Sequence, residues 1–298
     1  MKLLKLLARL AEITPQQLSA AGPRRTALRR LAQAGTAVLP AVLTALPQPA
    51  AARDVPTVQD VLKLALTLAQ LEAELYSRAL GLSAGGPAAP GTFLSADDRA
   101  AIQTILLHEQ RHIVQFTQLV QNSGGTLEPT PRFDFTGSKN GTQAALFPDV
   151  FTNAETFLKV AQLVEDTGVR AYKGQVEYIQ YDNFLLETAL RAHSTEARHA
   201  AHIRTMRRQR GATVKSWVSP TDAPIVPGGS AASKAYADED SYMQYLANNN
   251  PVPFVDSLPI NVATPPLSQA AMLAKVAEAF DEPMAAATAG ELLGLFIY

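Results

Sequence analysis

Two copies of the pattern Glu-x-x-His are the residues of this sequence whose types and spacing point most directly to chemistry. Glu109 is followed three positions later by His112, and Glu196 is followed in the same way by His199. Residues three apart share one face of a helix, so each pattern presents a carboxylate and an imidazole to the same point. These groups are ligands for iron, manganese and zinc. The two copies therefore predict a metal site between two helices.

Both patterns lie on helical stripes that are otherwise apolar. One stripe contains Ile102, Ile105, Glu109, His112, Phe116 and Leu119, and the other contains Leu185, Ala189, Ala192, Glu196, His199, Ile203 and Met206. Glu165 is the lone carboxylate on a third apolar stripe. The alternative is a glutamate at the boundary of that stripe, with its neighbour Asp166 marking a wetter turn. An ionisable group buried in such a stripe is costly unless it is paired or binds metal. We therefore expect Glu165 to join the two patterns.

The remaining three histidines are weaker candidates. His108, His193 and His202 lie off the apolar stripes or at their edges. We expect them to be polar surface residues. The basic run at residues 204–210 is likewise expected to be a solvated helix end, as is the run at residues 24–30.

Four long helical patterns must position the candidate ligands. They cover residues 57–80, 95–121, 153–178 and 182–210, and glycines end the first, second and fourth. A short Gly/Pro-rich loop joins the first pair and a tight turn joins the last pair, whereas residues 125–152 form a long middle connection. A long connection lets the chain cross back, as in the single-crossover connectivity of ferritin-like bundles. The prediction is an all-α four-helix bundle with a long crossover between its second and third helices.

The predicted bundle, residues 56–211, is flanked by two other segments. Residues 1–55 contain an amphipathic helical pattern, and residues 212–298 form an irregular extension that ends in short helices and wraps the bundle or mediates assembly. The apolar tail at residues 292–298 would be costly in water, so it is expected to pack on the bundle or on a partner subunit. A homo-oligomer is expected.

The N-terminal segment has two interpretations. Arg24 and Arg25 precede an uncharged stretch, residues 31–46, and a small-residue exit at Ala50-Ala51-Ala52. This arrangement resembles a twin-arginine export signal and would place the protein in the periplasm or cell envelope. The alternative is a helix that docks on the bundle or a neighbouring subunit of a cytoplasmic protein. Both interpretations stay open.

Composition narrows the function further. The 298 residues are 47% hydrophobic and 18% charged, as in a globular protein, and the net charge of −1 leaves no basic footprint for nucleic acid. The chain has no cysteine, which excludes thiolate metal sites, iron–sulfur clusters and disulfides. No apolar run reaches the roughly 18 residues of a membrane-spanning helix. Any metal must therefore be held by oxygen and imidazole.

At this point the chain resembles the ferritin-like domain family, in the branch that includes desiccation-related proteins of plants and bacteria. The resemblance covers residues 55–298 and is carried by residues 71–76 (LEAELY), 165–172 (EDTGVRAY), 196–201 (EARHAA) and 279–283 (AFDEP). Two-metal carboxylate bundles take a Glu from each of two helices and Glu-x-x-His from each of the other two. The resemblance implies a di-iron or di-manganese site that includes Glu165 and a first-helix glutamate.

The first helix departs from the family pattern. In ferritin-like relatives its ligand usually lies seven residues before an aromatic residue such as Tyr76, and that position is Ala69. The nearest inward carboxylate is Glu72, about 4.5 Å further along the helix axis, while Glu74 groups with the polar face. Either Glu72 reaches the site from one turn away or the first-helix ligand is missing. An asymmetric site is expected.

The leading hypothesis is a di-metal oxidation site in which Glu109 and Glu196 bridge the two ions. Its partners would be metal ions with dioxygen or peroxide, in iron(II) oxidation, catalase-like peroxide chemistry or metal sequestration under stress. A structural or assembly module with a degenerate or absent metal site is the alternative, favoured by Ala69, the N-terminal amphipathic pattern and the apolar C-terminal tail. A hydrolytic zinc site is a third and weaker hypothesis, because no His-Glu-x-x-His is present.

Overall fold

A computed structural model describes residues 55–84, 92–226, 230–241, 243–245, 251–253 and 268–298. The export-signal pattern and the basic run at residues 24–30 lie outside the described residues. Residues 55–298 contain all of the described elements and form one unit. Within the part of the chain that the structure describes, no helix is both long enough and apolar enough to cross a bilayer.

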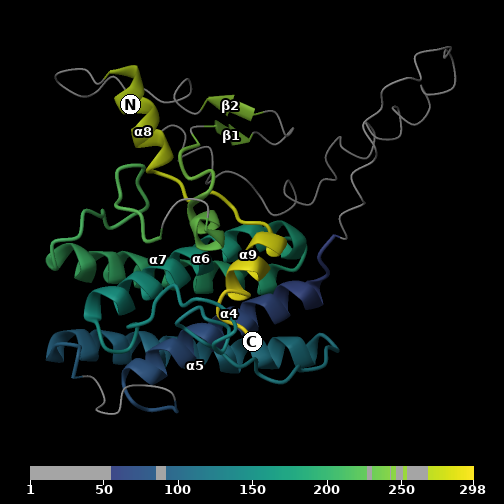
Figure 1. Cartoon of the computed structure of the whole chain (residues 1–298). Coiled ribbons are helices and arrows are strands. Elements are labelled where there is room, and N and C mark those ends of the chain that lie inside the picture. Colours follow the sequence, from purple (N-terminus) through teal and green to yellow (C-terminus); the bar gives the residue numbers. More distant parts are fainter. Residues whose placement is uncertain (1–54, 85–91, 227–229, 242, 246–250, 254–267) are drawn as a thin grey trace, which may run out of the picture. The chain divides into compact units, whose positions relative to one another are not determined.

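Four long helices dominate the described chain (Figure 1). They are α4 (Val58–Ala79), α5 (Ala96–Asn122), α6 (Ala154–Ile179) and α7 (Asn183–Gln209). Thr57 and Ser95 each close a reciprocal capping box with an aspartate three residues on, and Asn153 and Asp182 each accept two backbone N–H groups. These side chains satisfy donors that the first helical turn leaves unpaired, so each helix begins within one residue of its predicted start.

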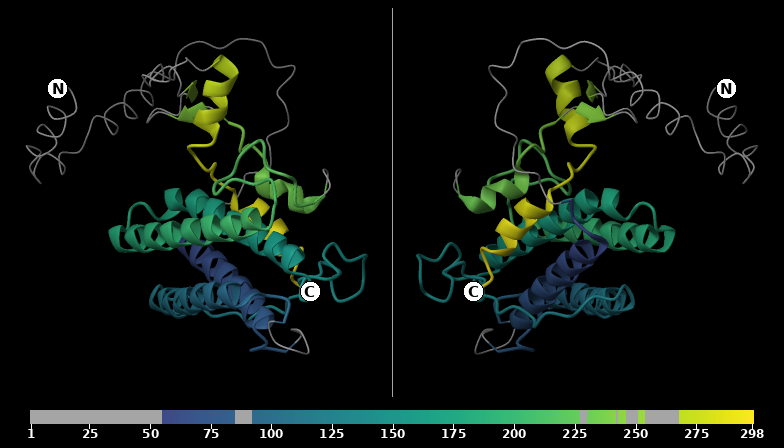
Figure 2. Two further views of the ribbon diagram at one scale, coloured as in Figure 1. Left: turned by 90° about the vertical axis from the view of Figure 1, so that its left-hand side faces the viewer. Right: turned by 90° about the vertical axis from the view of Figure 1, so that its right-hand side faces the viewer.

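The helices pack in the predicted order. Helix α4 packs against α5 and α6, and α6 packs against α7, so the crossover after α5 brings the second pair beside the first (Figures 1 and 2). The all-α ferritin-like bundle is thus confirmed. The extension adds the 3₁₀ helix η1 (Ala231–Tyr236), a two-stranded antiparallel pair β1 (Met243–Tyr245) and β2 (Pro251–Pro253), and helices α8 (Gln269–Ala277) and α9 (Ala286–Leu293).

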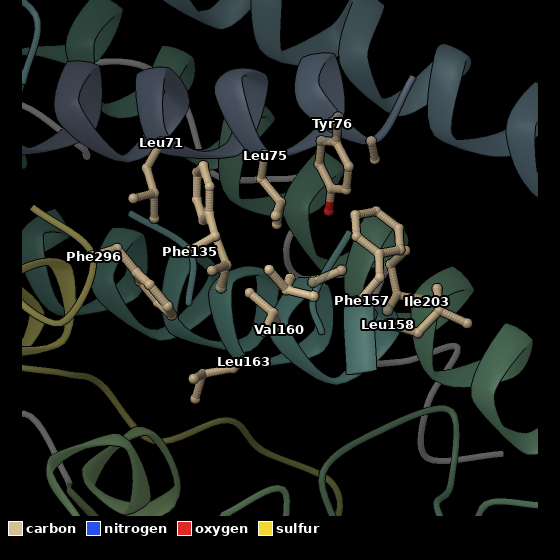
Figure 3. Close-up of a cluster of buried hydrophobic side chains, with 14 of the residues drawn as sticks. Leu71, Leu75, Tyr76, Phe135, Phe157, Leu158, Val160, Leu163, Ile203 and Phe296 are labelled. Atoms are coloured by element: carbon tan, nitrogen blue, oxygen red, sulfur yellow. The ribbon is translucent and has the colours of Figure 1, made fainter. Parts of the chain in front are cut away.

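The C-terminal tail is part of the bundle's core. Figure 3 shows Phe296 beside Phe135 of the crossover, close to Leu71 of α4 and Val160 of α6. Phe296 is buried, and its carbonyl accepts a hydrogen bond from the amide of Asp134 at 2.7 Å. The apolar tail therefore packs on the bundle of its own chain, the first of its two expected locations.

The basic end of α7 differs from its prediction. Arg204 and Arg207 are each only 1% exposed. Arg204 donates to both carboxylate oxygens of Asp166, at 2.9 and 2.6 Å, and to Asp222 at 2.6 Å. Arg207 donates to Gln162 at 2.6 Å. The expectation of a solvated helix end was wrong for these two residues, and Asp166 marks no wetter turn because its charge is paired inside the protein.

Helix α6 also anchors the extension. The Arg170 guanidinium donates to the carbonyls of Ala235, Ala237 and Glu282 at 2.5, 2.7 and 2.9 Å. One turn later, a Cβ added at Gly174 would lie 1.9 Å from the carbonyl oxygen of Met284. Only glycine permits that approach, so the sequence of α6 specifies where the returning chain lies.

Candidate metal centre

The six predicted ligands come from all four long helices and are buried. Helix α4 contributes Glu72, α5 contributes Glu109 and His112, α6 contributes Glu165, and α7 contributes Glu196 and His199. The four glutamates are 0% exposed, and the histidines are 8% and 4% exposed. Four carboxylates without solvent are a large unfavourable charge density unless cations or protons balance them.

Glu109 contacts both imidazoles through different oxygens. Its Oε2 lies 3.0 Å from Nδ1 of His112 and its Oε1 lies 3.0 Å from Nδ1 of His199. Glu196 does the same, with Oε1 3.0 Å from His112 and Oε2 3.2 Å from His199. Each carboxylate therefore spans the two histidines, and the two Glu-x-x-His patterns face each other.

These contacts divide the site into two overlapping sets of ligand atoms. One set contains Glu109, His112 and Glu196, the other contains Glu165, Glu196 and His199, and within each set the atoms lie within 4.8 Å of one another. Two ligand atoms each about 2.1 Å from one ion, at a right angle, are about 3.0 Å apart. The observed separations match that spacing, so each set could hold one ion and Glu196 belongs to both.

Glu165 lies on the His199 side of the site. Its Oε2 is 3.5 Å from Nδ1 of His199. Its Oε1 accepts a hydrogen bond from the hydroxyl of Tyr76 in α4. That bond fixes one oxygen of the carboxylate and leaves the other directed toward the histidine.

Glu72 is buried beside the other carboxylates but belongs to neither set of three. Neither of its oxygens has a hydrogen-bond partner among the described residues. A Cβ added at Gly168 of α6 would lie 2.9 Å from Oε1 of Glu72, so the absence of a side chain at Gly168 makes room for this carboxylate. The Glu72 side chain thus extends from α4 toward the site, while Ala69 lies in the surrounding apolar cluster.

The electrostatics of the site follow from burial and crowding. Burial opposes charging of both histidines. At His112, the hydrogen bonds that Glu109 and Glu196 accept from the ring outweigh burial and raise the pKa to about 10. At His199, the charge of Glu165 and the hydrogen bonds that Glu109, Glu165 and Glu196 accept from the ring overcome burial and raise the pKa to about 12. Burial alone would raise the pKa of Glu196, but its two histidine partners lower it to about 2.

The two remaining carboxyls are harder to ionise. Burial raises the pKa of Glu165 to about 8, against the opposing charge of His199. Burial, followed by repulsion from Glu196 and Glu109, raises the pKa of Glu72 well above its usual range. Without metal, the histidines, Glu165 and Glu72 therefore tend to stay protonated. A cation that bound here would displace these protons.

Four ionised carboxylates carry four negative charges, which two divalent cations and two neutral imidazoles would balance. The oxygens of Glu72 have no hydrogen-bond partner among the described residues. Glu109, Glu165 and Glu196 each direct an oxygen at a histidine. All of these oxygens provide acceptors for such ions. Oxygen and imidazole donors suit iron and manganese. The type of ligand atom, the distances between the ligand atoms and the total charge of the carboxylates all fit a pair of such ions.

His108 is a residue of this site that the sequence did not reveal. Its Nδ1 lies 2.9 Å from Nε2 of His199, on the side of that ring opposite the carboxylates. It is half-buried, so the expectation of a surface residue was wrong. Its position one turn before His112 was the available signal, since both residues lie near the same helix face.

The other two histidines lie outside the site. His193 is also half-buried, with Nδ1 3.0 Å from the carbonyl of Val169, whereas His202 is exposed as expected.

Comparison with known proteins agrees with this geometry. The sequence profile of the ferritin-like domain family matches residues 57–209. No curated protein matches the chain. The matched residues contain all four long helices and all six carboxylate and histidine residues of the site. This chain belongs to the ferritin-like domain family.

Proposed function

We propose that the protein binds two divalent ions of iron or manganese and uses them in iron(II) oxidation or peroxide decomposition. The observation that supports this proposal most directly is that Glu109 and Glu196 each contact both His112 and His199 inside a solvent-excluded site. A structural ion pair would need only one carboxylate for each imidazole. The surplus of negative charge supports a site built for cations.

The contacts suggest a role for each side chain. Glu109 and Glu196 would each serve both ions. His199 and Glu165 would hold one ion, and His112 would hold the other. Glu72, with two unpartnered oxygens, would add a carboxylate to the ion held by His112, directly or through water.

Bound iron or manganese would supply one-electron exchange with dioxygen or peroxide. The chain supplies position and surroundings. The hydroxyl of Tyr76 orients Glu165, and His108 accepts the Nε2 proton of His199 so that Nδ1 stays free to bind. Buried apolar residues on either side of the ligands exclude bulk water.

Two finer assignments belong to the same proposal. We place the protein in the desiccation-related branch of the family, with a role in stress protection, on the strength of the four sequence segments described above. We also propose export to the periplasm or cell envelope through the twin-arginine pattern at Arg24 and Arg25.

Metal content tests the proposal directly. Metal-free protein is titrated with Mn(II) and Fe(II) under nitrogen, and bound metal is measured by elemental mass spectrometry. Wild-type protein should bind two ions per chain, and Glu196→Gln should lose most of both because it removes a charge shared by the two positions. Glu187→Gln, an exposed residue of the same helix, is the matched control and should bind two. Equal binding by Glu196→Gln and wild type would refute the bridge.

Reaction with Fe(II) and dioxygen, and separately with peroxide, then selects the chemistry. If two ions bind and neither oxidant is consumed, the protein sequesters metal. If no metal binds, the alternative of a homo-oligomeric assembly module becomes the better function. Ala69 favours that alternative, but the apolar tail no longer does, because it is buried within its own chain.

A further inference from the structure

A cleft lies between the bundle and the C-terminal extension, and none of the six candidate metal ligands lines it. Its volume is about 440 Å³, and its lining includes Gln162 of α6, Arg204 of α7 and Tyr236 of η1. The other described lining residues belong to the extension, which lies beside α6 and α7 in Figures 1 and 2. The volume is within the range of about 300–1,000 Å³ that is typical of small-molecule sites.

The polar part of the cleft is held in place by buried hydrogen bonds. Arg204 donates two hydrogen bonds to Asp166 and one to Asp222. The hydroxyl of Tyr236 donates to Asp166 at 2.8 Å and accepts from Gln162 at 3.2 Å. The guanidinium of Arg204 is therefore already paired with two carboxylates, and it offers little to an anionic ligand.

The lining carries more negative charge than positive charge. Asp222, Glu239 and Asp240 are its acidic residues, and Arg204 is the one basic residue among its described members. Arg204 also divides its charge between Asp222 and the buried Asp166. A cleft lined by an excess of one sign of charge concentrates ligands of the opposite sign. The lining therefore favours a cation and disfavours a phosphate or a carboxylate.

Glu239 has one carboxylate oxygen available to such a cation. The residue is 6% exposed. Its Oε1 lies 2.6 Å from Nε of Arg170 and accepts the backbone N–H of Glu282 at 2.8 Å, whereas no described residue hydrogen-bonds its Oε2. Burial raises the pKa of Glu239 to about 7, because Arg170 offsets only part of the cost of burying the charge. A cation in the cleft would add to that counter-charge.

The apolar part of the cleft excludes a bare metal ion as its preferred ligand. The extension contributes Val218, Pro220, Pro224, Ile225 and Val226 to the lining, and these side chains offer nothing to a hydrated ion. Within the part of the chain that the structure describes, three or more acidic or histidine side chains converge closely enough to hold a metal only at the candidate metal centre. A cation that matches the cleft therefore has an apolar part of its own.

We infer that this cleft binds a small organic cation in which an ammonium group is attached to a hydrocarbon chain. The ammonium group pairs with Glu239 and Asp240, and the hydrocarbon chain packs on the apolar side chains of the extension. Because the cleft joins α6 and α7 to the extension, the bound cation also stabilises the folded arrangement of these segments. The inference goes beyond the proposed metal function and does not depend on it.

Three probes that share a six-carbon chain and differ in charge test the ligand class. Hexylammonium, 1-hexanol and hexanoate are each titrated at pH 8 into the full-length, metal-free protein, and binding is measured by calorimetry. Hexylammonium should bind about tenfold more tightly than 1-hexanol, because it adds hydrogen bonds between charged groups. Hexanoate should not bind measurably. Equal affinities for hexylammonium and 1-hexanol, or binding of hexanoate, would overturn the inference.

Ethylammonium tests the contribution of the hydrocarbon chain. It carries the same charge as hexylammonium but lacks four methylene groups, so it should bind at least about tenfold more weakly. The same calorimetric titration measures it. If ethylammonium bound as tightly as hexylammonium, the acidic residues alone would account for binding and the assigned ligand class would be wrong.

Substitutions locate the ammonium group. Glu239→Gln and Asp240→Asn should each weaken hexylammonium binding several-fold and leave 1-hexanol binding unchanged. Asp240 is exposed, so its variant tests the site even if Glu239→Gln, which alters the partner of Arg170, does not fold.

Asp238→Asn is the matched control for both variants. Asp238 is exposed, does not line the cleft and has a φ of 66°, a conformation that asparagine also adopts. This variant should bind hexylammonium as the wild type does. Unchanged hexylammonium affinity in folded Asp240→Asn, or an equal loss of affinity in Asp238→Asn, would refute the assigned position of the ammonium group.

Discussion

Glu72 and Gly168 form a complementary pair across two helices. Ala69 occupies the position at which the resemblance to ferritin-like proteins implies a first-helix ligand, and the α4 carboxylate that extends toward the site is Glu72, three residues later. This displaced carboxylate needs space that an ordinary α6 residue would occupy, and Gly168 leaves that space open. Glycine costs a helix interior about 1 kcal/mol relative to alanine, so a benefit elsewhere is expected.

Gly168→Ala tests this pair. The new methyl group would lie 2.9 Å from Oε1 of Glu72 and push the carboxylate away from the site. We expect Mn(II) affinity at one of the two positions to fall about tenfold, as when groups that support a ligand are lost. Calorimetric titration measures it. Gly290→Ala is the control, since a Cβ there meets nothing within 4 Å. Equal affinity in the two variants would mean that Glu72 does not need the space.

His108 should matter through His199 rather than by direct binding. His108→Ala removes the acceptor 2.9 Å from Nε2 of His199, so the imidazole loses the partner that fixes its tautomer and ring orientation. Metal affinity is expected to fall about 10- to 100-fold, with thermal stability of the metal-free protein nearly unchanged. His202→Ala, at an exposed position of α7, should bind metal normally. A normal affinity for His108→Ala would exclude the positioning role.

How far the sequence could predict the site depended on whether the relevant contacts are local. The facing of Glu109 and His112 follows from helix geometry within four residues. His108 was missed because its partner, His199, is on another helix. Neither Glu-x-x-His pattern indicates how far α5 and α7 are shifted relative to each other along the bundle. Whether the six residues bind metal stays a prediction.

At the scale of elements, the helix ends were predictable and the buried arginines were not. Thr57, Ser95, Asn153 and Asp182 cap helices through hydrogen bonds that span two or three residues. Arg204 is paired with Asp166, 38 residues earlier, and with Asp222, in the extension. A cluster of arginines at a helix end has the same sequence pattern whether it faces water or is covered by another segment of the chain, as the extension covers Arg204 here.

Arg204→Met should therefore destabilise the fold strongly. The substitution leaves Asp166, which is 3% exposed, without its bidentate partner, although Tyr236 still donates to it. Removing one partner of a buried pair costs about 3–5 kcal/mol. Urea unfolding followed by circular dichroism measures the change. Arg208→Met, an exposed neighbour in the same helix, should change stability by less than about 0.5 kcal/mol. Similar losses in both variants would refute the importance of the pair.

At the scale of the whole molecule, metal binding at the candidate centre would be coupled to folding, because all four long helices contribute residues to it. The ligands converge only when α4 and α5 are packed against α6 and α7. Metal that binds the folded chain alone stabilises every element of the bundle together, by about 2.7 kcal/mol for one site at a free concentration of 100 times Kd. Loss of metal should then lower the unfolding temperature of the bundle as a unit.

This coupling should depend on pH, with a definite sign. In the metal-free protein, His112 and His199 have pKa values of about 10 and about 12, above the ordinary 6.5. Their stabilisation is complete below pH 6.5 and declines as the pH rises toward those values. Glu165, with a pKa of about 8 against an ordinary 4.5, holds a proton more tightly when folded and acts in the same direction. The metal-free protein should therefore lose stability between pH 6.5 and 8.

Metal binding has the opposite dependence. Each histidine must lose its proton before Nδ1 can bind, and Glu165 must ionise, so binding releases protons and tightens as the pH rises. The difference in unfolding temperature between the Mn(II)-loaded and metal-free proteins should widen from pH 6.5 to pH 8, as measured by scanning calorimetry. Glu187→Gln should show the same widening, and Glu196→Gln should show almost none because it holds little metal. If the difference stayed constant over this range, the ions would not be replacing protons at these histidines, and the assigned ligands would be wrong.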